Sequence, residues 1–274
     1  MAIVVNTNIP SIAASRALYE TRKDLETAME RLSSGKRING AKDDAAGLTV
    51  VSRMKAQIAS LNQAVRNVND GISLAQTYDG AADEIDGILV RMRELATQSA
   101  NGTYLTADRT NLNQEFQHLV SEINRIADKT DWNGTFTLAA TAATVSVQAG
   151  FDSTDTISIT LNDLNTSSLG LTTTNTLATL TDAGDALAAI DGAISAVMEA
   201  RAKIGAITNR LEHTASNLMN VVQRTEEAKS RILDADFAAE SAALAKANVL
   251  AQAGTAMLAQ ANQTPQYILT LLRG

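Results

Sequence analysis

The chain has no cysteine and only two prolines in 274 residues. Without cysteine it can form no disulfide, no thiolate metal site and no cysteine nucleophile. Both prolines lie near the ends, at Pro10 and Pro265, so the long stretch between them lacks the strongest helix breaker. These absences exclude thiol chemistry and favour long helices.

Aromatic residues are scarce as well, at 3%, and the net charge is −7. An acidic chain is not attracted to phosphate backbones, and so few rings provide no platform on which bases could stack. The chain contains no run of about 18 apolar residues, which is the length that a membrane-spanning helix needs. We therefore expect neither nucleic acid nor membrane as a partner.

Lys and Arg are absent from Thr130 to Ala200, a stretch with eight acidic residues that we interpret as a solvated acidic lobe. The chain also lacks a glycine-rich cofactor loop and a nucleophile–base arrangement, and His118 and His213 lie far apart. We expect no enzyme activity, no catalytic residue, no cofactor and no metal. The N-terminus has no basic start followed by an apolar region, so ordinary secretory export is not expected.

Apolar residues instead recur at alternating steps of three and four, which is typical of helices packed along their length. One such run begins Val51, Met54, Ile58, Leu61. The spacing predicts a first long helix from Asp44 to Asn101, about 85 Å long if uninterrupted. A shorter return helix to about Lys129 and a long helix starting at Asp182 or Asp185 complete the pattern.

The region 136–180 differs, because it is rich in Thr and alternates in "TVSVQ" (144–148) and "TISITL" (156–161). This alternation predicts a β-hairpin, preceded by a turn at Asn133-Gly134. The expected fold is mainly α: a long helical rod with a small β-hairpin region.

The two ends carry matched but thin apolar stripes, and residues 247–272 have no charge at all. An alanine-rich helix with so little apolar surface is marginal in isolation. We therefore predict that both ends are stabilised by neighbouring copies, and that residues 1–40 and 235–274 are disordered in the monomer. The candidate packing residues of the two end segments are Leu18, Leu25, Leu32, Leu244, Leu250 and Leu258.

The stretch "ERLSSGKRINGAKDDAAGL" (30–48) interrupts the helical pattern. Its Gly-Lys pair lacks the spacing of a phosphate-binding loop, and adjacent Asp43 and Asp44 would not face one metal ion. We interpret the stretch as a corner between helices. Gly35 stops one helix in a left-handed conformation, and Asp43 or Asp44 caps the next.

The same residues carry a resemblance to bacterial flagellin. It covers roughly residues 1–136 and 180–274, with the matching blocks in the family's order. These blocks include "ERLSSGKRINGAKDDAAGL" (30–48), "RNVNDGISLAQT" (66–77), "RMRELATQSANGT" (91–103), "IGAITNRLEHTASNL" (204–218), "SRILDADFAAE" (230–240) and "LAQANQTPQYILTLL" (258–272). The short middle implies a form that lacks the outer variable domains.

The resemblance implies a structural subunit that self-assembles into the flagellar filament for swimming motility. It implies that the N- and C-terminal helices pair as a coiled coil, in an inner-tube domain made of 1–42 and 232–274. It also implies a helical rod domain over 43–231 with the hairpin insert at about 136–180. The subunit would be secreted through the flagellar export channel to an extracellular flagellum. Its implied partners are its own copies, an export chaperone, and the filament cap and hook-junction proteins. The alternative is the hook–filament junction protein itself.

A further implied partner is the animal innate immune receptor for flagellin. The family's contact residues map to Arg91 and Glu115, with Leu95 nearby, whereas Val90 stands where recognised flagellins often carry Gln. The alternative, which we favour, is that Arg91 lies in a subunit contact or on a solvated face.

Overall fold

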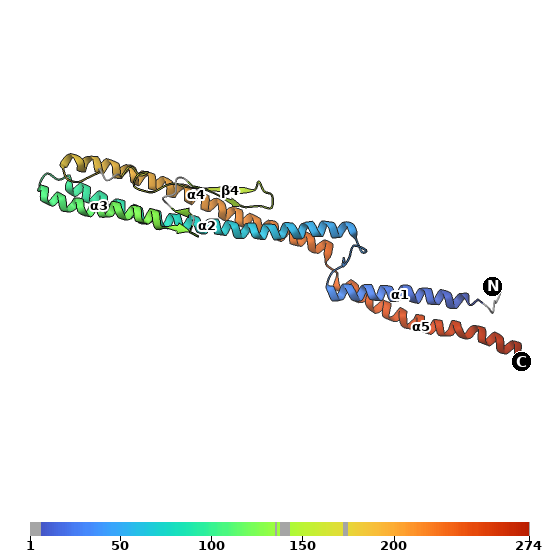
Figure 1. Cartoon of the computed structure of the whole chain (residues 1–274). Coiled ribbons are helices and arrows are strands. Elements are labelled where there is room, and N and C mark those ends of the chain that lie inside the picture. Colours follow the sequence, from blue (N-terminus) through green and yellow to red (C-terminus); the bar gives the residue numbers. More distant parts are fainter. Residues whose placement is uncertain (1–6, 135, 138–142, 172–174, 274) are drawn as a thin grey trace. The chain divides into compact units, whose positions relative to one another are not determined.

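The computed structural model describes residues 7–134, 136–137, 143–171 and 175–273. It forms two compact units, one of Met1–Ala56 with Arg224–Gly274 and one of Gln57–Gln223. The described residues are mostly helical, which confirms the mainly α fold (Figure 1). The helices are α1 (Ile9–Ser34), α2 (Ala45–Ser99), α3 (Thr106–Lys129), α4 (Leu180–Leu233) and α5 (Phe237–Arg273). The units divide within α2 and α4, whereas the expected domain boundaries follow the breaks between helices.

In the first unit, α1 and α5 lie side by side and run in opposite directions (Figure 1). Asn8, at the start of α1, caps that helix through Ser11 N and donates a hydrogen bond to Ala261 O near the end of α5. At the other end of the pair, Arg31 contacts Glu240. The resemblance stated above implies terminal helices paired in this way.

The ends of these two helices meet at a corner in the same unit. Arg37 N donates to Leu233 O at 2.7 Å, and Ala235 N donates to Gly35 O at 3.0 Å. A small apolar cluster of Ile38, Val51 and Leu233 lies beside these backbone bonds. The breaks after α1 and after α4 are therefore joined to each other.

The second unit has a continuous core to which α2, α3 and α4 all contribute, including Ile85, Leu89, Phe116 and Ile190. Strands β3 (Ala143–Gln148) and β4 (Thr156–Leu161) form the antiparallel hairpin that the Thr-rich alternation predicts, with Ala143 opposite Leu161. The inner faces of both strands join that core.

Two close contacts hold the hairpin region against α2. A Cβ added at Gly71 would stand 3.0 Å from Val147 of β3, so only glycine fits without a shift. The Tyr78 hydroxyl donates to Asn162 O at 2.7 Å. Burial raises the pKa of Tyr78 well above its ordinary value, so this phenol stays neutral and remains a donor.

Asn133 and Gly134 have positive φ angles of 54° and 68° and lie between the short strands β1 (Asp131–Trp132) and β2 (Phe136–Thr137), which confirms the expected turn. The predicted start of the last long helix is wrong, because α4 begins at Leu180 and Thr179 Oγ1 accepts from Asp182 N. The parts of the expected insert at 138–142 and 172–174 lie outside the described residues.

Candidate functional site

The seam between α1 and α5 contains most of the residues expected to pack there. Leu18 is buried, whereas Leu25, Leu32, Leu244 and Leu258 are half-buried. Small residues allow the two backbones to come close: a Cβ added at Gly254 would lie 3.2 Å from Leu18 Cδ1.

Leu250 is placed differently from the other candidates, because 48% of its surface is exposed. It borders an open depression of about 330 Å³ between α1 and α5, which Asp24, Ala28 and Ala247 also line. Leu250 thus flanks the seam rather than filling it. The heptad steps through Leu244, Ala247, Ala251, Gly254 and Leu258 skip this position.

Burial within this unit is limited. Its buried apolar side chains, among those that the structure describes, are Leu18, Ala28, Ile38, Val51, Leu233 and Ala247. On α1 and α5 themselves only Leu18, Ala28 and Ala247 belong to this group, and two of them are alanines. A seam of this kind provides little hydrophobic stabilisation, because the free energy follows the apolar area removed from water.

The same two helices expose large apolar side chains, from 48% to 72% of each residue's surface. Helical spacing places Ile9, Ile12 and Tyr19 on the side of α1 away from the seam. On α5, Val249 faces away from the seam and Met257 lies beside it. We call the whole set the terminal apolar surface; it consists of Ile9, Ile12, Tyr19, Met29, Phe237, Val249, Leu250 and Met257.

Sequence reasoning identified only Leu250 of this surface. A seam residue is visible in a sequence because it recurs with the helical period. An exposed apolar residue on another side has no such period, and its exposure depends on where the partner helix lies. The one available signal was the missing charge over 247–272, which points to α5 but to no single side chain.

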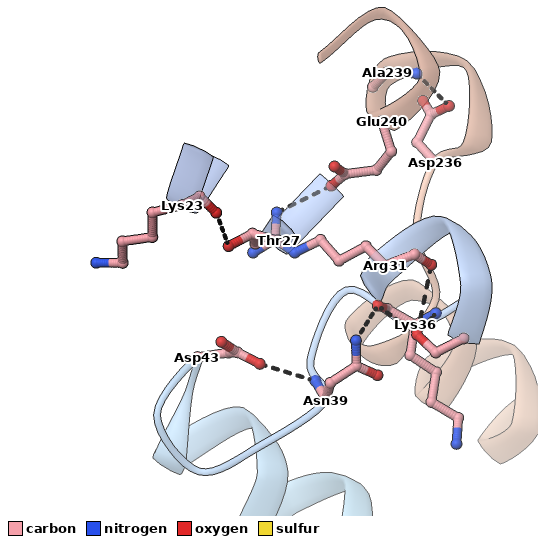
Figure 2. Close-up of polar contacts among 10 residues, drawn as sticks. Lys23, Thr27, Arg31, Lys36, Asn39, Asp43, Asp236, Ala239 and Glu240 are labelled. Atoms are coloured by element: carbon pink, nitrogen blue, oxygen red, sulfur yellow. Dashed lines mark hydrogen bonds and ion pairs between the residues drawn. The ribbon is translucent and has the colours of Figure 1, made fainter. Parts of the chain in front are cut away.

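The corner residues Gly35, Asp43 and Asp44 adopt three distinct roles. Gly35 ends α1 with a φ of 67°, as expected for a left-handed helix stop. Asp44 caps α2, since its Oδ1 accepts from Gly47 N at 2.8 Å. Asp43 instead closes the preceding loop by accepting from the backbone N–H groups of Asn39 and Gly40, both at 3.0 Å; Figure 2 shows its bond to Asn39. These two bonds lower the pKa of Asp43.

The three residues considered for the innate receptor lie in the second unit. Arg91 donates from Nε and Nη2 to Glu115 Oε1, at 3.0 and 2.9 Å, and from Nη1 to Glu94. The Glu115 contact is the main cause of the raised Arg91 pKa. Arg91 and Glu115 are exposed, whereas Leu95 is 1% exposed and belongs to the core.

Other kinds of site find little support. Within the described part of the chain, no three His, Cys, Asp or Glu side chains gather as a metal site would require. None of the helices, over the residues that are described, has the length and hydropathy needed to span a bilayer. The terminal apolar surface is therefore the strongest candidate site, and its chemistry is apolar association.

Comparison with known proteins assigns both halves of the chain to regions of the same family. Residues 5–143 match the family model described as the bacterial flagellin N-terminal helical region, and residues 187–272 match that of the C-terminal helical region. A flagellin from Halalkalibacterium halodurans is 46% identical over 272 residues, covering 99% of this chain and all of the relative.

Two more distant proteins add to this comparison. Flagellin D from Vibrio anguillarum is 33% identical over an alignment of 376 positions, which covers 99% of this chain and all of the relative. That alignment is longer than the present chain, as expected for a short form. A solved structure of a flagellar hook-associated protein from Vibrio parahaemolyticus has a TM-score of 0.56, covering 70% of this chain and all of that one. Its identity of 14% shows a shared fold alone.

Proposed function

This chain belongs to the bacterial flagellin family, and on that premise we propose that the terminal apolar surface of α1 and α5 joins its copies into the flagellar filament. The family regions and the full-length relative make it a structural subunit of that filament and a motility protein. Nothing in the comparisons favours the hook–filament junction protein, which was the alternative. The family's role is structural rather than enzymatic.

One observation carries the proposal: among the side chains that the structure describes, α1 and α5 bury few between themselves and leave eight large apolar ones exposed. Fully burying one such side chain contributes about 1.5–3 kcal/mol. Association costs about 4–15 kcal/mol in lost translational and rotational freedom. Several such burials per subunit are enough to offset that cost.

The distribution of the surface around both helices fits an open polymer. Tyr19 and Val249 face away from the seam, whereas Leu250 and Met257 lie beside it, so contacts are available in more than one direction. Contacts that join different faces of identical subunits, and that do not close into a ring, generate a helical filament.

The finer partners and the location are part of the same proposal. The subunit leaves the cell through the flagellar export channel and becomes part of an extracellular filament. Because residues 247–272 are uncharged, an export chaperone covers this segment before assembly. The filament cap and hook-junction proteins contact the subunits at the two ends of the polymer.

The animal innate receptor for flagellin remains a candidate partner through Arg91 and Glu115, which are exposed and bonded to each other. Leu95 takes no part in this candidate contact, because its side chain is in the core. The interpretation of Arg91 that we favour is a solvated ion pair on the subunit's own surface.

Charged substitutions on the terminal apolar surface test the proposal. We expect Tyr19→Asp and Val249→Asp to raise the critical concentration for polymerisation at least about tenfold, since burying a charge costs more than 1.4 kcal/mol. Both side chains are exposed, so the thermal unfolding of the free subunit should not change. Pelleting and electron microscopy give the critical concentration, and circular dichroism gives the unfolding.

The matched controls are Tyr19→Phe and Val249→Ile, which keep the apolar character at the same positions. They should polymerise as the parent chain does. Filaments of normal length from both Asp variants, at the parent's critical concentration, would rule out this surface as the assembly contact.

A further inference from the structure

The seam between α1 and α5 contains one charged contact among the side chains that the structure describes. Arg31 Nη1 donates to Glu240 Oε1 at 3.0 Å, with side chains only 30% and 15% exposed; Figure 2 shows the two residues reaching toward each other. Arg31 Nε is buried without a hydrogen-bond partner. Partly buried ion pairs with incomplete hydrogen bonding contribute little net stability, but they are well suited to fixing register.

The rest of the seam discriminates poorly between registers. On α5, a shift of seven residues exchanges Leu244 with Ala251 and Gly254 with Ala261, so the apolar pattern is kept although the side-chain volumes differ. The heptad spacing is unchanged by such a shift. The apolar pattern alone therefore permits neighbouring registers, which differ only in how well they pack.

A slip of seven residues in one direction would place Arg31 opposite Ala247. A slip in the other direction would place it opposite residues that precede α5. In both cases Arg31 and Glu240 would lose each other as partners. The other hydrogen bonds between the described parts of the two helices are weaker because they are uncharged: Asn8 Nδ2 donates to Ala261 O, and Ser11 Oγ donates to Asn262 Oδ1. Both lie at the far end of the pair. The backbone bonds at the corner, between Gly35 and Ala235, reach no further into the helices.

We infer that the Arg31–Glu240 ion pair sets the register of α1 against α5 and so aligns the terminal apolar surface for the neighbouring subunit. Arg31 and Glu240 are thus positioning residues that act through the helices they align. The inference rests on the proposed assembly role of this surface, although the register itself is a property of the free subunit.

The absence of native cysteine makes the register directly measurable. An ideal Cβ at Gly254 lies 3.8 Å from Leu18 Cβ, which is within the range of about 3.5–4.5 Å for a disulfide. Leu18→Cys with Gly254→Cys therefore reports the native register. Leu18→Cys with Ala247→Cys or with Ala261→Cys reports a slip of seven residues in either direction.

The experiment compares disulfide yield in dilute free subunits that carry Arg31→Glu, Glu240→Arg or both. We expect each single reversal to lower the native-register yield about tenfold and to raise a slipped-register yield, because two like charges then face each other. The double reversal should restore the native yield, and Arg31→Lys should keep it. Arg16→Glu is the matched control, since Arg16 pairs with Glu20 on the exposed side of the same helix.

Native-register yields unchanged by the single reversals would overturn the inference and assign the register to the corner bonds. A double reversal that fails to restore the yield would also overturn it, as would the absence of a native-register disulfide in the otherwise unaltered chain. These outcomes are separate from a failure of the proposed function, which Tyr19→Asp and Val249→Asp test by polymerisation.

Discussion

At the residue scale, the corner shows why two neighbouring aspartates have separate tasks. Asp44 lies one residue before α2 and caps it, whereas Asp43 bonds to the loop behind it. The sequence predicts that one of the two aspartates caps α2. It does not distinguish between them, because they have the same side chain and adjacent positions. Which one caps depends on the path of the loop after Gly35, and that path is fixed by contacts with Leu233 and Ala235 far along the chain.

Asp43 leads to a prediction about pH. Its backbone hydrogen bonds, to Asn39 first and then Gly40, lower its folded pKa below the ordinary value of 3.8. A lowered folded pKa means that the carboxylate stabilises the corner above pH 3.8 and that this contribution is lost as pH falls through the folded pKa. NMR titration of the Asn39 and Gly40 amide shifts in the free subunit should give a midpoint below 3.8.

Asp43→Asn is the control for this titration, because it keeps the shape of the side chain and removes the ionisation. The low-pH shift change at both amides should then disappear. A midpoint at or above 3.8 in the parent chain would contradict the assigned bonds.

At the element scale, the steps of three and four predict the long helices well. The expected helix from Asp44 to Asn101 is observed as Ala45–Ser99, and the return helix ends at Lys129 as expected. The start of α4 was missed because Asp182 and Asp185 resemble caps, whereas Thr179 supplies the bond. Periodicity locates a helix, but its first residue depends on a single side-chain contact.

The paired terminal helices lead to a prediction about the free subunit. The described parts of residues 1–40 and 235–274 lie mostly in α1 and α5. The seam between these two helices buries little apolar area, so it adds little to their stability. That both segments are disordered or only weakly stable in the monomer stays a prediction.

Hydrogen exchange on dilute free subunits measures this local stability. Amides in α1 and α5 should exchange about a hundredfold faster than those around Ile85 to Leu95 of α2, because the second unit has an extensive core. The same amides should become protected in filaments. Equal protection of α1, α5 and central α2 in the free subunit would show that the terminal helices need no neighbours for their stability.

At the scale of the whole molecule, the two units have different physical characters. The unit of Gln57–Gln223 buries a core of its own, from α2, α3, α4 and the hairpin. The other unit buries few side chains and exposes the terminal apolar surface. One chain thus combines a part with an extensive core of its own and a part whose exposed apolar surface is suited to association.

The most direct test of this account asks whether the terminal apolar surface is covered in the filament. A single cysteine introduced as Tyr19→Cys or Val249→Cys can be labelled selectively, since the chain has no other thiol. The measurement is the rate of maleimide labelling in free subunits and in assembled filaments. The account predicts rapid labelling of free subunits and labelling at least about tenfold slower in filaments, as expected for a side chain removed from solvent. Equal rates in the two states would contradict it.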